Sequence, residues 1–363
     1  MKRNITQVKP NNSINRIGLT NVLLIVILGV NIMLGYRYRS TTEYCNTEYT
    51  HHQVDAPIFF VYDHKTDSEL LPKQFRTFAQ MYKTKSRSYN GSYIGLEDLK
   101  VSGGQQPSAS QFIEINKNLD YKLGAVLDLR KESHVILNGI PVSWYGRGNA
   151  ANVHKTTQQV EQDQLTRLNE LRQLEGQAIN VSHIIKEGIR GDVDRVRTEK
   201  ILVSKVSSEK ELLASMGIKY HRFYITDHHG PTVAELDKFV RFVLDWNVTQ
   251  FNSSKPYLYL HCRGGFGRTT SMMSVFDMIF NSKRVSLKDI LDRNVLSGGR
   301  NLIAKYNGIE GEIKMKDPGI VGTYRHYRAI LRYDRLKHFY KYCKTNSDGF
   351  ETSYAEYTTI TQQ

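Results

Sequence analysis

The residues that could carry out chemistry lie in one glycine-rich segment around Cys262. This cysteine follows His261 at the end of an apolar run, residues 257–260, and five residues separate it from Arg268. The intervening residues are Arg263, Gly264, Gly265, Phe266 and Gly267. Glycines allow positive φ, so that successive N–H groups turn inward and form an anion-binding nest. A planar guanidinium matches two phosphate oxygens. The segment therefore predicts a phosphate-binding loop.

A cysteine in such a loop is suited to attack phosphorus. The inward N–H groups, the start of the following helix and Arg268 favour the thiolate of Cys262 near neutral pH. Attack would give a cysteinyl-phosphate, which water then hydrolyses. Thr269 is expected to donate a hydrogen bond to the cysteine sulfur, to cap the following helix, or both. The alternative, a buried structural cysteine in a tight turn, leaves the glycines unexplained.

A departing alkoxide needs a proton, and Asp227 is the best candidate to supply it. It lies in the loop Thr226–Thr232, which contains Gly230 and Pro231 and precedes an amphipathic segment. A turn or cap aspartate is the simpler role for this residue. His228 could contact a substrate phosphate or brace the loop. Arg263 could contact substrate or be a solvated charge.

The surrounding residues predict the elements that position this loop. Residues 125–129 and 257–260 are predicted to be buried strands, because they are short apolar or β-rich runs. Apolar residues at helical spacing predict helices from residue 231 to 244 and from 269 to 280. Further helices are expected over 156–174 and 324–342. The order of strand, glycine-rich turn and helix is the context that a phosphate-binding loop requires.

Composition narrows the class of protein only in part. The 363-residue chain has 40% hydrophobic and 24% charged residues, which is typical of a folded protein. Its net charge of +14 favours anionic partners. Nucleic acid is the weakest of these, because no recognition motif is present. The three cysteines argue against a disulfide framework, although Cys45 and Cys343 could pair. The chain has no CxxC pair, which argues against a cysteine zinc site, and we expect no metal and no cofactor.

The N-terminal region carries a targeting signal. Residues 17–36 contain no charged side chain, and about 20 such residues can cross a bilayer as a helix. The basic residues before them predict a cytosolic N-terminus, residues 1–16, and an extracytoplasmic catalytic domain. The rival is a cleaved signal peptide and a secreted protein, but no small-x-small site follows. Residues 37–65 are expected to be a linker, 66–345 the catalytic domain, and 346–363 a flexible tail.

The motifs together resemble the PTP-like inositol polyphosphate phosphatases, the bacterial cysteine phytases of the protein tyrosine phosphatase superfamily. The Cys-x5-Arg spacing is the superfamily's signature, and further pieces follow the family's order between about Leu70 and Lys344. These pieces are Leu71–Thr77, Ser102–Gly103, Ser108–Phe112, Asp128–His134, Asn138–Gly146, Thr226–Thr232 and the Cys262 loop. The resemblance implies an α/β fold, a central sheet flanked by helices, with a small partial β-barrel attached.

The resemblance also implies an activity and roles for residues. It implies stepwise, metal-independent hydrolysis of inositol hexakisphosphate. Cys262 would be the nucleophile, Arg268 the phosphate clamp, Asp227 the general acid and His228 a substrate contact. Additional phosphate ligands would be Arg76, Arg130 and Lys305, although a structural arginine or a surface lysine is equally ordinary at these positions.

One departure from the family leaves the substrate open. The phytases usually carry Glu-Ala where this chain has Arg263-Gly264, and phosphatases of inositol lipids tend to be basic there. A phosphoinositide or phosphotyrosine phosphatase, including a secreted effector, is therefore the alternative to a phytase. A non-catalytic phosphate-binding protein is a third hypothesis, which the presence of an acid at Asp227 disfavours.

Overall fold

The computed structural model describes residues 58–64, 70–84, 89–187, 193–249, 256–303 and 320–361. The chain divides into two units, residues 1–48 and residues 49–363, and every described residue belongs to the second. The expected membrane segment at 17–36, Cys45 and Lys305 lie outside the described residues. None of the helices in the described ranges is both long enough and apolar enough to span a membrane.

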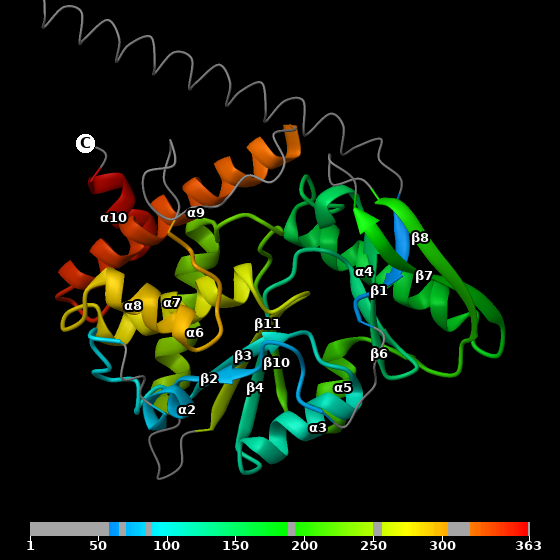
Figure 1. Cartoon of the computed structure of the whole chain (residues 1–363), viewed down its shortest axis with the longest axis horizontal. Coiled ribbons are helices and arrows are strands. Elements are labelled where there is room, and N and C mark those ends of the chain that lie inside the picture. Colours follow the sequence, from blue (N-terminus) through cyan, green and yellow to red (C-terminus); the bar gives the residue numbers. More distant parts are fainter. Residues whose placement is uncertain are drawn as a thin grey trace, which may run out of the picture. The chain divides into compact units, whose positions relative to one another are not determined.

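A five-stranded sheet forms the centre of the fold, in the order β10-β4-β11-β3-β2 (Figure 1). The strands are β2 Arg76–Thr77, β3 Val101–Gln105, β4 Leu123–Asp128, β10 Lys219–Arg222 and β11 Tyr257–Cys262. β11 pairs in parallel with both β3 and β4, and β10 pairs in parallel with β4. The predicted strands at 125–129 and 257–260 are thus confirmed as neighbours.

Alternating side chains of the central strands enter two different cores, as the pleat of a strand requires. Leu258 and Leu260 of β11 belong to one hydrophobic cluster, whereas Tyr259 belongs to another. The first cluster includes α6 Val233–Thr249, α7 Gly267–Asn281, α8 Leu287–Leu296 and α9 Ile320–Thr345, together with the short α2 Phe78–Lys83. The second includes α3 Ala109–Asn118 and α5 Glu209–Ser215. Helices therefore cover both faces, as expected for an α/β fold.

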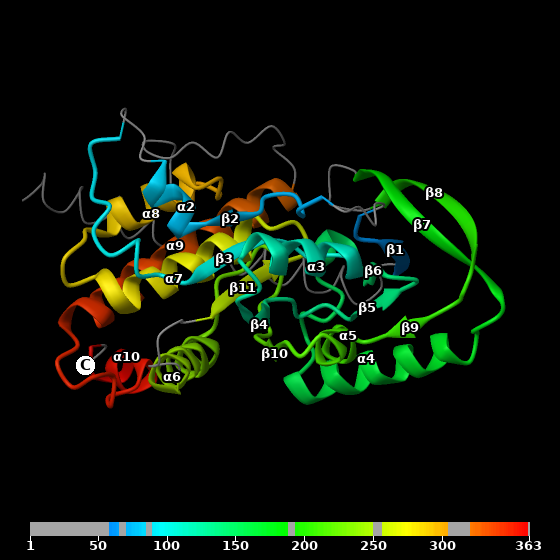
Figure 2. The ribbon, with the colours of Figure 1, turned by 90° about the horizontal axis from the view of Figure 1, so that it is seen from below.

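A second sheet has six strands in the order β8-β7-β1-β6-β5-β9. These are β1 Phe59–Tyr62, β5 His134–Leu137, β6 Ile140–Tyr145, β7 Ala178–Glu187, β8 Val193–Leu202 and β9 Val206–Ser207. Figure 2 shows β7 and β8 as a long twisted ribbon. Helix α4 Thr157–Arg172 packs Leu168 and Leu171 against this sheet. The expected partial β-barrel stays a prediction, and in the described residues β8 and β9 are the edge strands of this sheet.

Two expected domain boundaries are wrong. β1 lies inside the stretch 37–65 that was expected to be a linker, because its Phe59 and Val61 pair with β6 and Val61 is fully buried. The expected flexible tail, 346–363, contains helix α10 Tyr354–Ile360. Tyr354 is fully buried, and its N–H donates to Asp237 of α6 at 2.6 Å. Residues 58–62 form an apolar run that is itself a signal for β1, whereas residues 346–363 have few apolar side chains and give little sign of a core helix.

Candidate active site

Strand β11 delivers Cys262 to its carboxyl end, and helix α7 begins five residues later at Gly267. Gly265 has φ +75°, and a Cβ there would lie 2.4 Å from the backbone carbon of Gly104. Gly264 has no such restriction, since its nearest neighbour would be 3.6 Å away. Of the three loop glycines, Gly265 alone has positive φ. The exposed Phe266 is the N-cap residue of α7, which corrects the expected cap at Thr269.

Three buried arginines surround the cysteine sulfur. Cys262 is 3% exposed, and its charge acts to raise the pKa of Arg76, Arg268 and Arg332, which therefore lie close to it. The Nε of each of these arginines is buried and has no hydrogen-bond partner among the described residues. Buried donors without partners are costly. An anion placed among these arginines would satisfy them, which supports a phosphate site beside Cys262.

Arg268 is held by a carboxylate that sequence reasoning had not assigned. Its Nη1 and Nη2 donate to the two oxygens of Glu132 at 2.6 and 2.8 Å. Nη1 also donates to the carbonyl of Ile225 at 3.1 Å. Burial lowers the pKa of Arg268, but Asp227 and Glu132 raise it well above its ordinary value. The guanidinium is therefore fixed in position and permanently charged, with Nε left for a ligand.

Asp227 lies beside Arg268, as the sequence-based assignment requires. The Asp227 carboxylate is 3.4 Å from Arg268 Nη2 and accepts a hydrogen bond from Asn149 at 2.8 Å. Burial raises the pKa of Asp227, but Arg268, His228 and the Asn149 hydrogen bond together hold it well below its ordinary value. Asp227 is consequently an anion in this arrangement. A substrate phosphate that binds Arg268 and adds negative charge would raise the pKa of Asp227.

Two other candidates in these loops behave differently from expectation. The hydroxyl of Thr269 donates to the carbonyl of Gly104 at 3.4 Å, so the expected bond to the Cys262 sulfur is not made. His228 adopts φ +63°, and its N–H donates to the Asp227 carboxylate at 2.9 Å. This bond braces the loop around Asp227. For the His228 side chain, both expected roles, contact with a substrate phosphate and support of the loop, stay predictions.

Arg76 and Arg130 were both expected to bind phosphate, and the structure gives them different partners. Arg76 Nη1 donates to the carbonyl of Gly265 at 3.0 Å, and burial lowers its pKa to about 10. Arg130 is completely buried, with Nη1 on Asp63 at 2.6 Å and Nε on Glu132 at 2.8 Å. Two carboxylates compensate its charge, but its Nη2 is buried without a hydrogen-bond partner among the described residues, so a phosphate contact of Arg130 stays a prediction.

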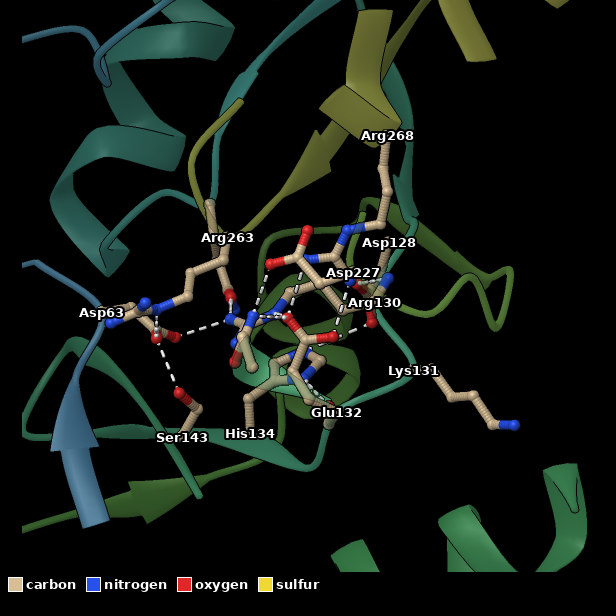
Figure 3. Close-up of polar contacts among 12 residues, drawn as sticks. Asp63, Asp128, Arg130, Lys131, Glu132, His134, Ser143, Asp227, Arg263 and Arg268 are labelled. Carbon is tan, nitrogen blue, oxygen red and sulfur yellow. Dashed lines mark hydrogen bonds and ion pairs between the residues drawn. The ribbon is translucent and has the colours of Figure 1, made fainter. Parts of the chain in front are cut away.

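These pairs join into a row of alternating charges (Figure 3). The row runs Arg263, Asp63, Arg130, Glu132, Arg268, Asp227. Arg263 Nε donates to Asp63 at 2.7 Å, so Arg263 is neither a simple solvated charge nor a residue that extends freely into the loop. The row connects Asp63, which directly follows β1 of the second sheet, to Arg268 on α7 and to Asp227 in the loop before α6.

Sequence reasoning missed Asp63, Glu132, Asn149 and Arg332. Asp63 was excluded because its segment reads as a linker, and Glu132 was quoted only within a family motif. Arg332 lies on α9, is 4% exposed and approaches the loop closely enough that a Cβ at Gly267 would be 3.0 Å from its Nη1. Its signal in the sequence is weak, because the helix that carries it contains many basic residues. Lys305 lies outside the described residues.

One group in the described part of the chain has the geometry of a metal site: Asp128, His134 and Glu209. However, the Asp128 carboxylate already accepts from Tyr220 at 2.8 Å and lies 3.1 Å from Arg222 Nε. Burial lowers the pKa of His134, but Asp128 and Glu209 raise it above its ordinary value. The donors and the Arg222 charge make this a buried ion-pair network that does not suit a cation.

Comparisons with known proteins agree with this geometry. The family model of the PTP-like phytases, whose description reads "Inositol hexakisphosphate", matches residues 127–280. The PTP-like myo-inositol phosphatase from Mitsuokella multacida, solved with myo-inositol-(1,3,4,5)-tetrakisphosphate, superposes with a TM-score of 0.67. It is 29% identical over 84% of this chain and 50% of that one. A PTP-like phytase from Bdellovibrio bacteriovorus has the same fold, with a TM-score of 0.60, 23% identity, and coverage of 84% and 95%.

A curated relative has a different description. The effector protein hopD2 from Pseudomonas syringae pv. tomato (strain ATCC BAA-871 / DC3000) is 29% identical over 270 residues. The match covers 72% of this chain and 52% of that protein. The chain thus spans about half the length of this relative and of the Mitsuokella enzyme.

Proposed function

We propose that this chain is a member of the PTP-like phytase family and a cysteine phosphatase that removes phosphate groups from inositol polyphosphates. The observation that carries the proposal is the set of buried arginines around Cys262 whose Nε atoms have no partner. A site that keeps several unsatisfied cationic donors beside a nucleophile suits a multiply charged phosphate ester.

The reaction follows from the positions of Cys262, Arg268 and Asp227. The Cys262 thiolate attacks phosphorus, and the bond from phosphorus to the ester oxygen breaks. Arg268 stabilises the charge that develops on the phosphoryl oxygens. Protonated Asp227 gives its proton to the departing oxygen, and then as a carboxylate it accepts a proton from the water that attacks the cysteinyl-phosphate. Inorganic phosphate leaves, and the thiolate is restored.

Phosphate release from the full-length protein tests this proposal. Inositol hexakisphosphate, a phosphoinositide and a phosphotyrosine peptide are supplied side by side. We expect release from inositol hexakisphosphate by the wild type and none by Cys262→Ser. Cys343→Ser is the matched control, because Cys343 is equally buried but lies in α9. Release from the lipid or peptide alone would reject the inositol polyphosphate assignment while keeping a phosphatase.

A phosphoinositide or phosphotyrosine phosphatase is the second candidate. The similarity to an effector protein and the basic Arg263 in the loop favour it. The pairing of Arg263 with Asp63 weakens the argument from charge alone, because the carboxylate compensates the charge of this arginine within the protein. The side-by-side assay decides between the two candidates.

We also propose that residues 17–36 attach the protein to a membrane, with the catalytic domain on the extracytoplasmic side. The support is the charge-free run in the sequence and the basic residues before it. Cell fractionation of the full-length protein and of a variant with two aspartates in this run tests the attachment. We expect the wild type in the membrane fraction and the variant in the supernatant.

A further inference from the structure

Strand β10 is an open edge of the central sheet. It pairs with β4 on one side, and among the described residues no strand pairs with its other side. The Phe223 N–H donates to the carbonyl of Asp128 in β4 at 2.8 Å, and the backbone groups of successive residues alternate in direction along a strand. The N–H and C=O groups of Tyr220 and Arg222 therefore point away from the sheet. An edge of this kind is a template for one more strand.

One of these outward groups already has a partner in the part of the chain that the structure describes. The carbonyl of Arg222 accepts a hydrogen bond from Lys238 Nζ of α6 at 2.8 Å. Within the same described residues, both backbone groups of Tyr220 and the N–H of Arg222 form no hydrogen bond, although Arg222 is only 8% exposed. Backbone groups that are shielded from water are normally paired. A segment in extended conformation would supply partners to all three.

A groove of about 820 Å³ leads to this edge. In Figure 2 β10 lies between α6 and α5, which belong to the two layers of helices that cover the faces of the central sheet. The walls of the groove include Leu165 and Leu168 of α4, Ala214 of α5 and Phe242 of α6. Leu165 is 50% exposed. The groove thus combines a free strand edge with apolar walls, which suits an extended peptide.

The charge that remains available in the groove is positive. The two carboxylates that line it have partners within the protein, because Glu211 pairs with Arg172 at 2.7 Å and Glu161 accepts from a tyrosine hydroxyl at 2.6 Å. Lys210 forms no ion pair among the described residues, and Lys238 donates to an uncharged carbonyl. Lysines in this situation favour a partner that carries acidic side chains.

We propose that β10 and this groove bind an extended acidic segment of a partner protein, which adds a strand to the central sheet. The segment brings backbone acceptors to the N–H groups of Tyr220 and Arg222, apolar side chains to Leu165, and carboxylates to the lysines. Arg222, the last residue of β10, lies five positions before Asp227. The surface therefore holds a partner protein near the active site, and it is distinct from the phosphate-binding loop.

Selection of random short peptides, displayed on phage, against the full-length protein tests the docking. We expect enrichment of peptides with alternating β-branched residues and with aspartate or glutamate, and a fluorescein-labelled copy of the most enriched peptide should bind. Leu165→Glu should weaken this binding about tenfold or more, because it replaces part of an apolar wall by an acid. Ile113→Glu is the matched control, since Ile113 of α3 is an aliphatic residue of similar exposure, 47% against 50%. Absence of acidic peptides, or equal losses in the two variants, would overturn the proposal.

Hydrogen exchange shows whether the enriched peptide pairs with the strand edge. In the free protein the amides of Tyr220 and Arg222 should exchange rapidly, and bound peptide should slow them about tenfold or more. The amides of Lys219 and His221 face β4 and should change little. Slow exchange of Tyr220 and Arg222 in the free protein would show that another part of this chain occupies the edge. That result, or unchanged exchange with peptide bound, would overturn the proposal.

Two further measurements separate this groove from other binding sites for the same peptide. Displacement of the labelled peptide by inositol hexakisphosphate would place the peptide among the arginines around Cys262 and reject the groove. Sedimentation of the wild type as a dimer that Leu165→Glu dissociates would assign the edge to a second copy of this chain, which also overturns the proposal. A monomer that binds the peptide equally well in the presence of the hexakisphosphate supports it.

Discussion

Glu132 binds Arg268 through both carboxylate oxygens, at 2.6 and 2.8 Å, and thereby determines which guanidinium nitrogen faces the nucleophile. The same carboxylate accepts from Arg130 and from Asn149. Because Asn149 also donates to Asp227, one buried acid orients both the phosphate clamp and the proposed general acid. Catalysis in this site therefore depends on a residue that need not touch substrate.

Replacing Glu132 tests this dependence. Glu132→Gln should lower kcat by about 100-fold or more and destabilise the fold by roughly 3–5 kcal/mol, because two arginines lose a buried partner. Urea unfolding gives the stability. Glu170→Gln, on the exposed face of α4, is the control. Unaltered kcat in a folded Glu132→Gln protein would contradict the role of Glu132 in orienting Arg268 and Asp227.

The pH dependence of stability gives a second readout for Glu132. Burial raises the pKa of Glu132, but Arg268 and Arg130 lower it to about 2. A depressed pKa contributes stability that is present above the unfolded value, near 4.5, and is lost as pH falls through the folded value. The difference in unfolding free energy between the wild type and Glu132→Gln should therefore be constant at neutral pH and shrink below about pH 4.5. A difference that grows in acid would contradict this assignment.

Asp227→Asn should remove the proton donor and leave the clamp in place. We expect kcat/KM to fall by about 100- to 10,000-fold. The wild type loses activity on the basic side as Asp227 deprotonates in the complex, and this limb should disappear in the variant. Profiles of kcat against pH measure this basic limb. Asp163→Asn is the control, because Asp163 is another partly exposed aspartate that pairs with an arginine. A variant that keeps the basic limb would assign the acid to another group.

The local elements of this fold were predictable because each depends on its own sequence. The strand ending at Cys262 and the helix after it follow from apolar spacing, and both are confirmed. The proximity of Cys262, Arg268 and Asp227 was also expected, and the structure brings Asp227 and Arg268 to 3.4 Å.

The polar network behind the loop could not be predicted from local sequence. Asp63 and Arg263 are 200 positions apart and meet only because β1 joins the second sheet. Arg130 was expected at the substrate because an arginine in a motif does not reveal which carboxylates surround it. Arg332 reaches the loop because α9 packs on α7. The sequence of α9 has little amphipathic pattern from which this packing could be predicted.

Adjacent glycines of the loop should differ sharply in their tolerance of a side chain. Gly265→Ala puts a Cβ 2.4 Å from backbone at φ +75°, so the loop must move. We expect a loss of about 1–3 kcal/mol in unfolding free energy and near-complete loss of activity. Gly264→Ala is the matched control, since its Cβ meets nothing closer than 3.6 Å. Thermal unfolding and phosphate release measure both, and equal effects would contradict the description of the loop.

Arg332 is a buried cation that forms no ion pair with a carboxylate in the described part of the chain. Burial and the nearby Arg300 lower the pKa of Arg332 to about 10, although Asp227 and Cys262 act in the opposite direction. Its Nε has no hydrogen-bond partner among the described residues. Arg293 is a contrasting buried arginine, because it donates to both oxygens of Asp277. The two arginines should therefore respond to substitution in opposite ways.

Arg332→Met should leave unfolding free energy unchanged or raise it, because it replaces an uncompensated buried charge by an apolar chain of similar length. The same substitution should lower kcat/KM for inositol hexakisphosphate about tenfold or more, because one phosphate donor is lost. Arg293→Met, in contrast, should destabilise the fold by roughly 3–5 kcal/mol, since it leaves Asp277 buried and unpaired. Urea unfolding and phosphate release on the same preparations measure both effects. An Arg332→Met protein that is less stable but fully active would show that this arginine supports the fold and does not bind phosphate.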